Sequence, residues 1–389
     1  MRKKLKDVCM FYSGTGFPIQ YQGQTKGEYP FYKVGDIANN AIAGKIYLEL
    51  CNNYISSDVA KMIKGCILPK DTVVFAKIGE ALKLNRRAIT SCDCLIDNNA
   101  MGIAPKLDSL RIQYFYFCMK NLKTQTLAES TTVPSVRKTV LEKYEIEVPS
   151  LVEQEEIEKK LTLTQKIIEK RRQELSYLDE IIKARFVEMF GDPVKNPKGW
   201  EVVTIGDIVT EVRYGTSKPA VEGGKYPYLR MNNLTADGHL DLNDLKYIDI
   251  PDDEIEKCVV RKGDVLFNRT NSIELVGKTV VFDLQEDMII AGYIIRVRLN
   301  KRLLPEILSQ YMNLEALKDI LRSMAKGAVN QANINAQELQ SIKVYIPDME
   351  LQKQFIEMKN QVDKSKVAVQ KALDETQILF DSLMQKYFG

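Results

Sequence analysis

The sequence is short of the residues on which most enzyme active sites are built. Its 389 residues include one histidine, His239, so a His-Glu-x-x-His metal site is excluded and no serine or cysteine nucleophile has an evident histidine partner. No Gly-x-x-x-x-Gly-Lys-Ser/Thr phosphate loop occurs, and the Gly-Thr-Gly at 14–16 lacks the third glycine of a dinucleotide-binding loop. We expect His239 to be a solvated turn residue. The missing catalytic groups favour a binding protein over an enzyme.

Long apolar runs and a disulfide framework are also missing. No apolar stretch reaches the roughly 18 residues that a transmembrane helix needs, and the N-terminus lacks the apolar core of a signal peptide, so we expect a cytoplasmic protein. The seven cysteines are irregularly spaced, which argues against disulfides. Cys92 and Cys94 form a lone Cys-x-Cys pair, which leaves a zinc site open as an alternative to our expectation of no metal. The net charge of +3 is small, so any nucleic-acid contact must come from local clusters of charge.

What the sequence does contain is an internal repeat. The matched blocks pair residues 5–8 with 205–208, 29–34 with 226–231, 70–75 with 262–267, and 146–154 with 344–352. Matched blocks in the same order indicate a duplication with a half-length of about 198 residues.

Each half opens with a stretch of mixed character. Short β-branched and aromatic runs separated by Gly, Asn, Asp and Pro predict strands over residues 72–76, 265–268 and 288–297. Helices are predicted over 110–120 and, in the second half, over 305–324.

Each half closes on a long amphipathic helix. Pro149 and Pro347 end a strand, and an apolar heptad stripe then continues without Gly or Pro through residues 151–189 and 349–387. Because each of these equal helices must bury its apolar stripe, we expect them to pack antiparallel on each other. The alternative is that each helix packs on the core of its own domain. The expected seam comprises Ile157, Leu161, Thr164, Ile168, Arg171, Leu175, Leu178, Ile182, Arg185 and Met189 of the first helix, and Phe355, Met358, Val362, Ser365, Val369, Ala372, Thr376, Leu379 and Leu383 of the second.

A short segment separates the halves. Gly191 suits a helix C-terminus, and Pro193 and Pro197 prevent the helix from continuing. We therefore predict an α+β protein with two similar, mixed, strand-rich domains, two long antiparallel helices in a coiled-coil-like bundle, and a pseudo-two-fold internal repeat. The predicted order is a first domain (1–150), a helix (151–190), a linker (191–200), a second domain (201–348) and a second helix (349–389).

These features together resemble the specificity (S) subunits of type I restriction-modification systems, over essentially the whole chain. The resemblance lies in the Pro-x-x-x-x-Gln entrance to each helix (Pro149 to Gln154, Pro347 to Gln352) and in the join from Phe190 to Trp200. It implies two target recognition domains, each reading half of a split, asymmetric site in double-stranded DNA. It also implies that methyltransferase (M) subunits, two of them, dock on the helices and bind S-adenosylmethionine, and that restriction (R) motor-nuclease subunits join for cleavage. This chain itself is then expected to bind no cofactor.

The sequence leaves two other functions open. One is a specificity subunit of a modification-only or other multisubunit DNA methyltransferase. The other is a helical scaffold that holds two domains apart without touching DNA. The Asn-Pro-Pro-Tyr motif of adenine methyltransferases is missing, and Asn196-Pro197 departs from it, so the chain is not expected to methylate DNA itself.

DNA reading needs basic side chains for phosphates, and Arg, Lys, Asn or Gln for base edges. Such residues follow the matched strands at 72–76 and 265–268, where Lys77 aligns with Arg269, and solvated loop charges are the alternative reading. The amide-rich stretch 326–335 and the small-residue loops 12–16 and 214–218 are further candidates, the latter for close approach to phosphate. The candidate DNA-binding residues are Lys33, Lys77, Lys83, Arg86, Arg87, Arg137, Arg230, Asn232, Asn268, Arg269, Asn271, Lys278, Lys326, Asn330 and Gln331.

Overall fold

The computed structural model describes residues 1–49, 51–128, 133–328 and 331–389. The chain forms two compact units. The first unit holds residues 1–172 and 371–389, and the second holds residues 173–370, so each contains one domain and one half of each long helix. Among the described residues, no helix is both long enough and apolar enough to span a lipid bilayer.

The first domain is built on a four-stranded sheet and two smaller groups of strands. Its strands are β1 (Arg2–Lys4), β2 (Cys9–Ser13), β3 (Tyr29–Tyr32), β4 (Tyr54–Ile55), β5 (Val73–Ala76), β6 (Arg87–Ile89), β7 (Leu95–Ile96), β8 (Ala100–Pro105) and β9 (Glu145–Glu147). The largest sheet is antiparallel in the order β2-β8-β5-β6, β3 lies between antiparallel β4 and parallel β7, and β1 pairs with β9. Its helices are α1 (Leu5–Val8), η1 (Ile19–Tyr21), α2 (Val34–Ile42), α3 (Ser57–Met62), α4 (Glu80–Lys83), α5 (Ile112–Asn121), η2 (Thr124–Leu127) and α6 (Lys138–Lys143).

The second domain repeats this plan with additions. Its strands are β10 (Glu201–Thr204), β11 (Val209–Tyr214), β12 (Tyr226–Leu229), β13 (Lys246–Ile248), β14 (Val259–Val260), β15 (Val265–Asn268), β16 (Thr270–Asn271), β17 (Thr279–Val281), β18 (Met288–Ile290), β19 (Ile294–Leu299), β20 (Lys326–Ala328), β21 (Gln331–Asn333) and β22 (Lys343–Ile346). Its helices are α8 (Ile205–Ile208), η3 (Met231–Asn233), α9 (Asp252–Cys258), α10 (Pro305–Met312), α11 (Glu315–Met324) and α12 (Ala336–Gln340).

The two domains share strand order and register, which confirms the internal repeat. The sheet β11-β19-β15-β17 matches β2-β8-β5-β6, and the parallel pair β12–β18 matches β3–β7. Phe75 lies opposite Met101 across β5 and β8, and Phe267 lies opposite Ile295 across β15 and β19. The duplicated sequence blocks therefore occupy the same places in two copies of one fold.

Two elements of the second domain are shorter than the sequence predicts. The expected strand 288–297 is divided into β18 and β19 by a turn, in which the Ile294 amide donates to the Ala291 carbonyl at 2.8 Å. The expected helix 305–324 is divided into α10 and α11 because the Asn313 side chain binds β17, with its amide 2.6 Å from the Thr279 carbonyl. Both breaks depend on partners distant in sequence.

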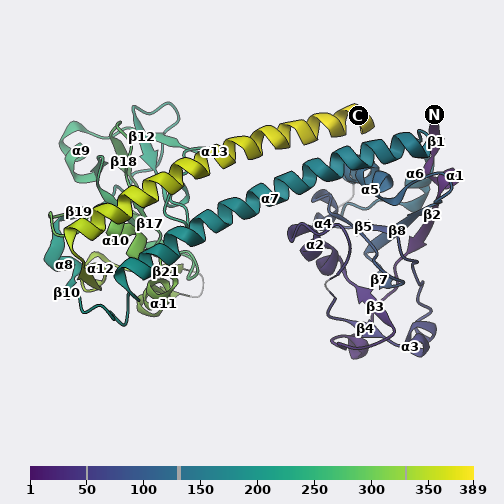
Figure 1. Cartoon of the computed structure of the whole chain (residues 1–389), viewed down its shortest axis with the longest axis horizontal. Helices are drawn as coiled ribbons and strands as arrows, with labels where there is room; N and C mark the ends of the chain where they lie inside the picture. The colour runs from purple at the N-terminus through teal and green to yellow at the C-terminus, as the bar shows by residue number, and fades with distance from the viewer. Residues whose placement is uncertain (50, 129–132, 329–330) are drawn as a thin grey trace. The chain divides into compact units, whose positions relative to one another are not determined.

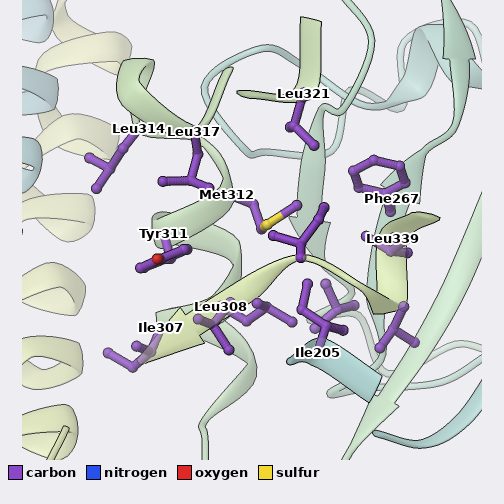
Figure 2. Packing of buried hydrophobic residues seen from close by; sticks show 14 of the residues in the cluster. Ile205, Phe267, Ile307, Leu308, Tyr311, Met312, Leu314, Leu317, Leu321 and Leu339 are labelled. Atoms are coloured by element: carbon purple, nitrogen blue, oxygen red, sulfur yellow. The ribbon is translucent and has the colours of Figure 1, made fainter. Parts of the chain in front are cut away.

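The core of the second domain lies between its main sheet and α10 and α11. Figure 2 shows Phe267 of β15 together with Leu308 and Met312 of α10 and Leu321 of α11, and all four side chains are buried. Because the core joins the strand before residue 269 to two helices, the position of that residue is fixed by the interior of the domain.

Two long helices, α7 (Leu151–Phe190) and α13 (Met349–Phe388), follow the domains. In the first unit, the Arg171 guanidinium of α7 donates to the Ala372 carbonyl and the Thr376 hydroxyl of α13. In the second unit, Asp179 pairs with Lys366 at 2.5 Å, while the rings of Phe186 and Phe355 lie 5.2 Å apart. Residue numbers rise along α7 as they fall along α13, so the helices pack antiparallel in each unit, as predicted (Figure 1).

The buried seam of these helices departs from a strict heptad pattern. Arg185, expected in the seam, is exposed and pairs with Glu188 at 2.7 Å, whereas the neighbouring Phe186 is buried. On α13, Ser365 and Leu379 are exposed and Phe380 is buried instead. A straight α-helix has 3.6 residues per turn, so a seam predicted at a period of 3.5 drifts around the helix over several turns.

The glutamine of the repeated Pro-x-x-x-x-Gln motif ties each long helix to its domain. The Gln154 amide donates to the carbonyls of Pro149 and Ser109, each at 2.9 Å, and its carbonyl accepts from the Arg111 amide at 2.8 Å. Gln154 is fully buried. One side chain thus links the end of a strand, the start of α7 and the residue preceding α5.

The second motif makes the same set of bonds. The Gln352 amide donates to the carbonyls of Pro347 (2.8 Å) and Arg302 (3.1 Å), and its carbonyl accepts from the Leu304 amide at 2.9 Å. Gln352 is also fully buried. The motif therefore has a structural role in both halves.

The segment between α7 and β10 is held by specific contacts. Asp192 accepts from the amides of Val194 and Lys195, at 2.9 and 2.8 Å, which lowers the pKa of its carboxyl group. The Trp200 indole donates to the Phe190 carbonyl at 2.8 Å, and the Tyr311 hydroxyl donates to the Pro193 carbonyl at 2.7 Å. The tryptophan and the aspartate of this join thus close a defined turn against the second domain.

Candidate nucleic-acid interface

Lys77 and Arg269 occupy equivalent backbone positions in the two domains. The Lys77 amide donates to the Asn99 carbonyl at 2.8 Å, and the Arg269 amide donates to the Tyr293 carbonyl at 2.9 Å. The carbonyls of Lys77 and Arg269 in turn accept from the amides of residues 136 and 334, each at 2.9 Å. The alignment drawn from the sequence is therefore reproduced bond by bond.

The site around Lys77 in the first domain, which we call the Lys77 site, also includes Lys33. Lys33 follows β3, and its ammonium lies 2.5 Å from the Gln22 side-chain oxygen and 5.6 Å from the centre of the Phe17 ring. The Asp97 carboxylate links the segments that follow β3 and β7, because it accepts from the amides of Val34 (3.0 Å) and Asn99 (2.8 Å). The backbone bond from Lys77 to Asn99 brings Lys77 into the same group.

Arg137 lies beside the Lys77 site. It directly follows Val136, whose amide donates to the Lys77 carbonyl, and it is exposed at the start of α6. Lys83 is exposed at the end of α4 and pairs with Glu80 at 2.7 Å.

The corresponding Arg269 site of the second domain borders an open pocket of about 620 Å³. The Arg269 guanidinium lies over the Tyr214 ring, 5.0 Å from its centre. Arg230, which is equivalent to Lys33, pairs with Asp244 at 2.7 Å, and Asn232 is exposed. The pocket is lined by Thr216, Ser217, Lys218, Pro219, Ala220, Tyr228, Arg230, Met231, Asn232, Arg269, Ala291, Gly292 and Tyr293.

β6 begins at Arg87 and pairs with β5, and the side chains of Arg86 and Arg87 have their own surroundings there. Arg86 borders a different pocket of about 390 Å³, which is also lined by Glu169 of α7 and Phe380 of α13. Arg87 is buried, with its guanidinium 2.7 Å from the Asn85 side-chain oxygen and 3.0 Å from the Thr124 hydroxyl. Burial lowers the pKa of Arg87. Its bonds to η2 give Arg87 a structural role, so it does not fit the prediction of a DNA contact.

Asn268 and Lys278 are also used inside their domain. Asn268 is fully buried, and its amide donates to the carbonyls of Thr270 and Tyr293, each at 3.2 Å. The buried Lys278 ammonium donates to the carbonyls of Met231 (2.8 Å) and Leu234 (2.5 Å), and burial lowers the pKa of this group. Neither side chain is free to reach a base edge, which corrects both predictions.

Asn271 is partly buried beside them. Its amide donates to the Asn268 side-chain oxygen at 2.8 Å, and its own side-chain oxygen accepts from the Ser272 amide at 2.9 Å. These bonds shape the turn after β16.

Within the amide-rich stretch 326–335, β20 and β21 pair antiparallel with each other, and β21 also pairs with β16. Lys326 and Gln331 lie in these strands, and only their backbones are described. Asn330 lies outside the described residues. These two strands are joined to the Arg269 site because the Ile334 amide donates to the Arg269 carbonyl at 2.9 Å.

Gly14 and Gly215 of the small-residue loops have a structural explanation. A side chain at Gly14 would meet the Asp97 carbonyl oxygen at 1.7 Å, and one at Gly215 would meet the Ile290 carbonyl oxygen at 2.1 Å. In both domains the loop after the first strand of the main sheet crosses a neighbouring strand at close range. These glycines permit contact within the domain, whereas the sequence suggested close approach to phosphate.

The remaining single-residue expectations concern histidine and cysteine. His239 lies in a turn but is half-buried, and its Nε2 lies 3.3 Å from the Lys366 ammonium of α13, so it is not fully solvated as expected. Within the described part of the chain, no group of three or more His, Cys, Asp or Glu side chains could hold a metal ion. All seven cysteines are free.

Sequence reasoning missed Tyr293. This residue is half exposed at the edge of the pocket and is equivalent to Asn99. The two residues occupy equivalent places in the two copies of the fold. The sequences around them are too dissimilar to be aligned without the structure. Tyr214 was noted only as part of a flexible loop, and its contact with Arg269 depends on the pairing of β11 with β19.

Comparison with known proteins identifies the family of this chain. The family described as "Type I restriction modification DNA specificity domain" matches residues 1–177 and 197–376. The chain belongs to this family. The resemblance found from the sequence is thus confirmed, and the matched ranges coincide with the two copies of the repeat.

Individual relatives include the putative type I restriction enzyme MjaX specificity subunit of Methanocaldococcus jannaschii. It is 30% identical over 196 residues, which are 49% of this chain and 46% of that protein. The type I restriction enzyme EcoKI specificity subunit of Escherichia coli is 25% identical over 286 residues, which are 68% of this chain and 61% of that protein. The chain thus matches between about half and three fifths of the length of these type I specificity subunits.

Solved structures share the fold over the whole chain. A type I restriction-modification S subunit from M. genitalium aligns with all of this chain and 96% of its own, with a TM-score of 0.54 and 14% identity. A chain from a study of assembly and conformational transition in a type I restriction-modification system aligns with all of this chain and 97% of its own, with a TM-score of 0.60 and 18% identity.

Proposed function

We propose that this type I specificity chain is the DNA-recognising subunit of a type I restriction-modification complex. Residues 1–150 and 201–348 each bind one half of a bipartite, asymmetric site in double-stranded DNA. The observation that carries the proposal is the pair of equivalent basic positions, Lys77 and Arg269, in two copies of one fold. Duplicated domains with different side chains at equivalent positions suit a target of two unequal halves.

The helices α7 and α13 hold the methyltransferase subunits and set the distance between the half-sites. Exposed apolar side chains along both helices support docking, since Tyr177, Ile181 and Val367 are 67%, 50% and 70% exposed. Exposed apolar side chains on neighbouring turns of a helix, such as Tyr177 and Ile181, are typical of surfaces on which another protein docks. The partner methyltransferase supplies S-adenosylmethionine and the transfer chemistry, and restriction subunits join the same assembly in the cytoplasm.

The proposal is tested by mapping methylated bases. The chain is co-expressed with its methyltransferase partner in cells that lack other modification, and modified bases in the genomic DNA are sequenced. The expected result is a motif of two short half-sites with a fixed, unspecified spacer, present only when both proteins are expressed. Modification that does not depend on this chain, or that follows a single continuous motif, would contradict the proposal.

A further inference from the structure

The Lys77 and Arg269 sites differ in three side chains at equivalent places. Ser13 lies opposite Met101 between β2 and β8, and Tyr214 lies opposite Ile295 between β11 and β19, so Tyr214 replaces Ser13. Arg269 replaces Lys77 in the same way. The third change puts Tyr293 in the place of Asn99. An arginine with two tyrosines therefore stands where the first domain has a lysine, a serine and an asparagine.

Tyr214 restrains the plane of the Arg269 guanidinium. The ring of Tyr214 lies 5.0 Å from the guanidinium carbon. Its hydroxyl accepts from the Ala336 amide at 2.8 Å, which fixes the ring against the start of α12. A flat guanidinium stacked on a held ring keeps its donors in a defined direction, whereas a lysine ammonium has no such preferred plane.

Among the described residues, Arg269 is also the cation lining this pocket for which no acidic partner is found. Lys218 pairs with Glu254 at 2.8 Å, and Arg230 pairs with Asp244 at 2.7 Å. Arg269 is half-buried, its Nε is inaccessible to solvent, and no described residue accepts a hydrogen bond from its guanidinium. The hydrogen-bond donors of Arg269 are therefore available to an acceptor outside the domain.

The acceptor that best fits a fixed, planar pair of donors is the major-groove edge of guanine, which presents N7 and O6 side by side. A phosphate would accept the same donors, but phosphates are identical in both half-sites and give no reason for the change from Lys77 to Arg269. Bases differ between half-sites. The exchange of three neighbouring side chains thus favours base reading.

We propose that Arg269, held against Tyr214, reads a guanine in the half-site bound by the second domain. This inference rests on the proposed function, because it assumes that the second domain binds one half of a bipartite site. It goes further by naming the base, the reading residue and the residue that positions it.

The test uses the assembled complex of this chain with its methyltransferase partner. The modified motif is first mapped for the wild-type complex. Each position of the second half-site is then substituted, and methylation rates are compared for wild type, Arg269→Lys and Arg269→Ala. Arg213→Lys is the matched control, because it makes the same change in the same domain at a residue outside the pocket that already has an acidic partner.

We expect one guanine in the second half-site whose replacement lowers methylation by the wild-type complex about 5- to 100-fold. Both Arg269 variants should lose most of this discrimination at that one position and keep it at the others. Arg213→Lys should keep it everywhere. Tyr214→Phe, which retains the ring, should discriminate better than Tyr214→Ala.

Three results would overturn the inference. The second half-site could contain no guanine, or Arg269→Lys could discriminate as well as wild type. The variants could also weaken binding equally for all sequences with a shallower dependence on salt, which would identify a phosphate contact. These results leave the bipartite motif intact, whereas a wild-type complex without such a motif would refute the proposed function as well.

Discussion

Replacing Gln352 by alanine should strongly destabilise the second domain at the start of α13. The buried side chain makes three hydrogen bonds to backbone groups, of Pro347, Arg302 and Leu304. Alanine leaves these groups without their partner. Each buried backbone group that loses its bond costs about 1–3 kcal/mol, so with three such groups we expect a loss of at least about 3 kcal/mol in the free energy of unfolding.

The matched control is Gln354→Ala, which makes the same change two residues later at an exposed position. It should alter the free energy of unfolding by less than about 0.5 kcal/mol. Urea denaturation compares the variants, and hydrogen exchange in the first turns of α13 locates the effect. If Gln352→Ala and Gln354→Ala unfold at the same urea concentration, the structural explanation of the Pro-x-x-x-x-Gln motif is wrong.

Three further predictions concern the helices and one buried lysine. Arg171→Ala removes the donor to Ala372 and Thr376 and should lower the free energy of unfolding by about 1–2 kcal/mol. The control is Arg172→Ala, because the Arg172 side chain is exposed. Equal melting curves for the two variants would contradict this prediction. Burial lowers the pKa of Lys318 from 10.5 to about 8, so the unfolded chain holds this proton more tightly and the folded state gains stability as pH rises between these values. Lys318→Met should lack that gain, which amounts to about 2 kcal/mol between about pH 7.5 and about pH 9.5, when urea denaturation of both proteins is compared at these two pH values, and parallel pH profiles would contradict it. About four residues are inserted into each long helix, near Gln173 in α7 and at the facing turn of α13, which adds about 6 Å and nearly one helical turn. The spacer in the mapped motif should then lengthen by about two base pairs. An unchanged spacer in a folded variant would show that the helices do not set it.

The sequence predicts the parts of the fold that are set by local pattern. The repeat, the strand at 265–268 and the long helices follow from residue periodicity and from Gly and Pro positions. The division of the predicted helix 305–324 does not, because Asn313 turns away from the helix to bind Thr279. Long-range hydrogen bonds of this kind leave no periodic signal.

The candidate site was predictable in position but not in composition. The repeat located Lys77 and Arg269, whereas Arg87 and Lys278 could not be separated from surface charges by sequence alone. Their burial depends on acceptors at Thr124 and Met231, which lie far along the chain. A charged residue in a loop becomes structural when the fold brings carbonyl or hydroxyl oxygens to it.

The most direct test of the central claim is an exchange of the second domain. Residues 201–341 are replaced by those of a related specificity subunit of known target, and the methylated motif is mapped with the same methyltransferase partner. We predict that the half-site read by the first domain and the spacer remain, while the other half-site becomes that of the donor. A motif in which both halves change, or neither does, would contradict the account of two domains that read DNA independently.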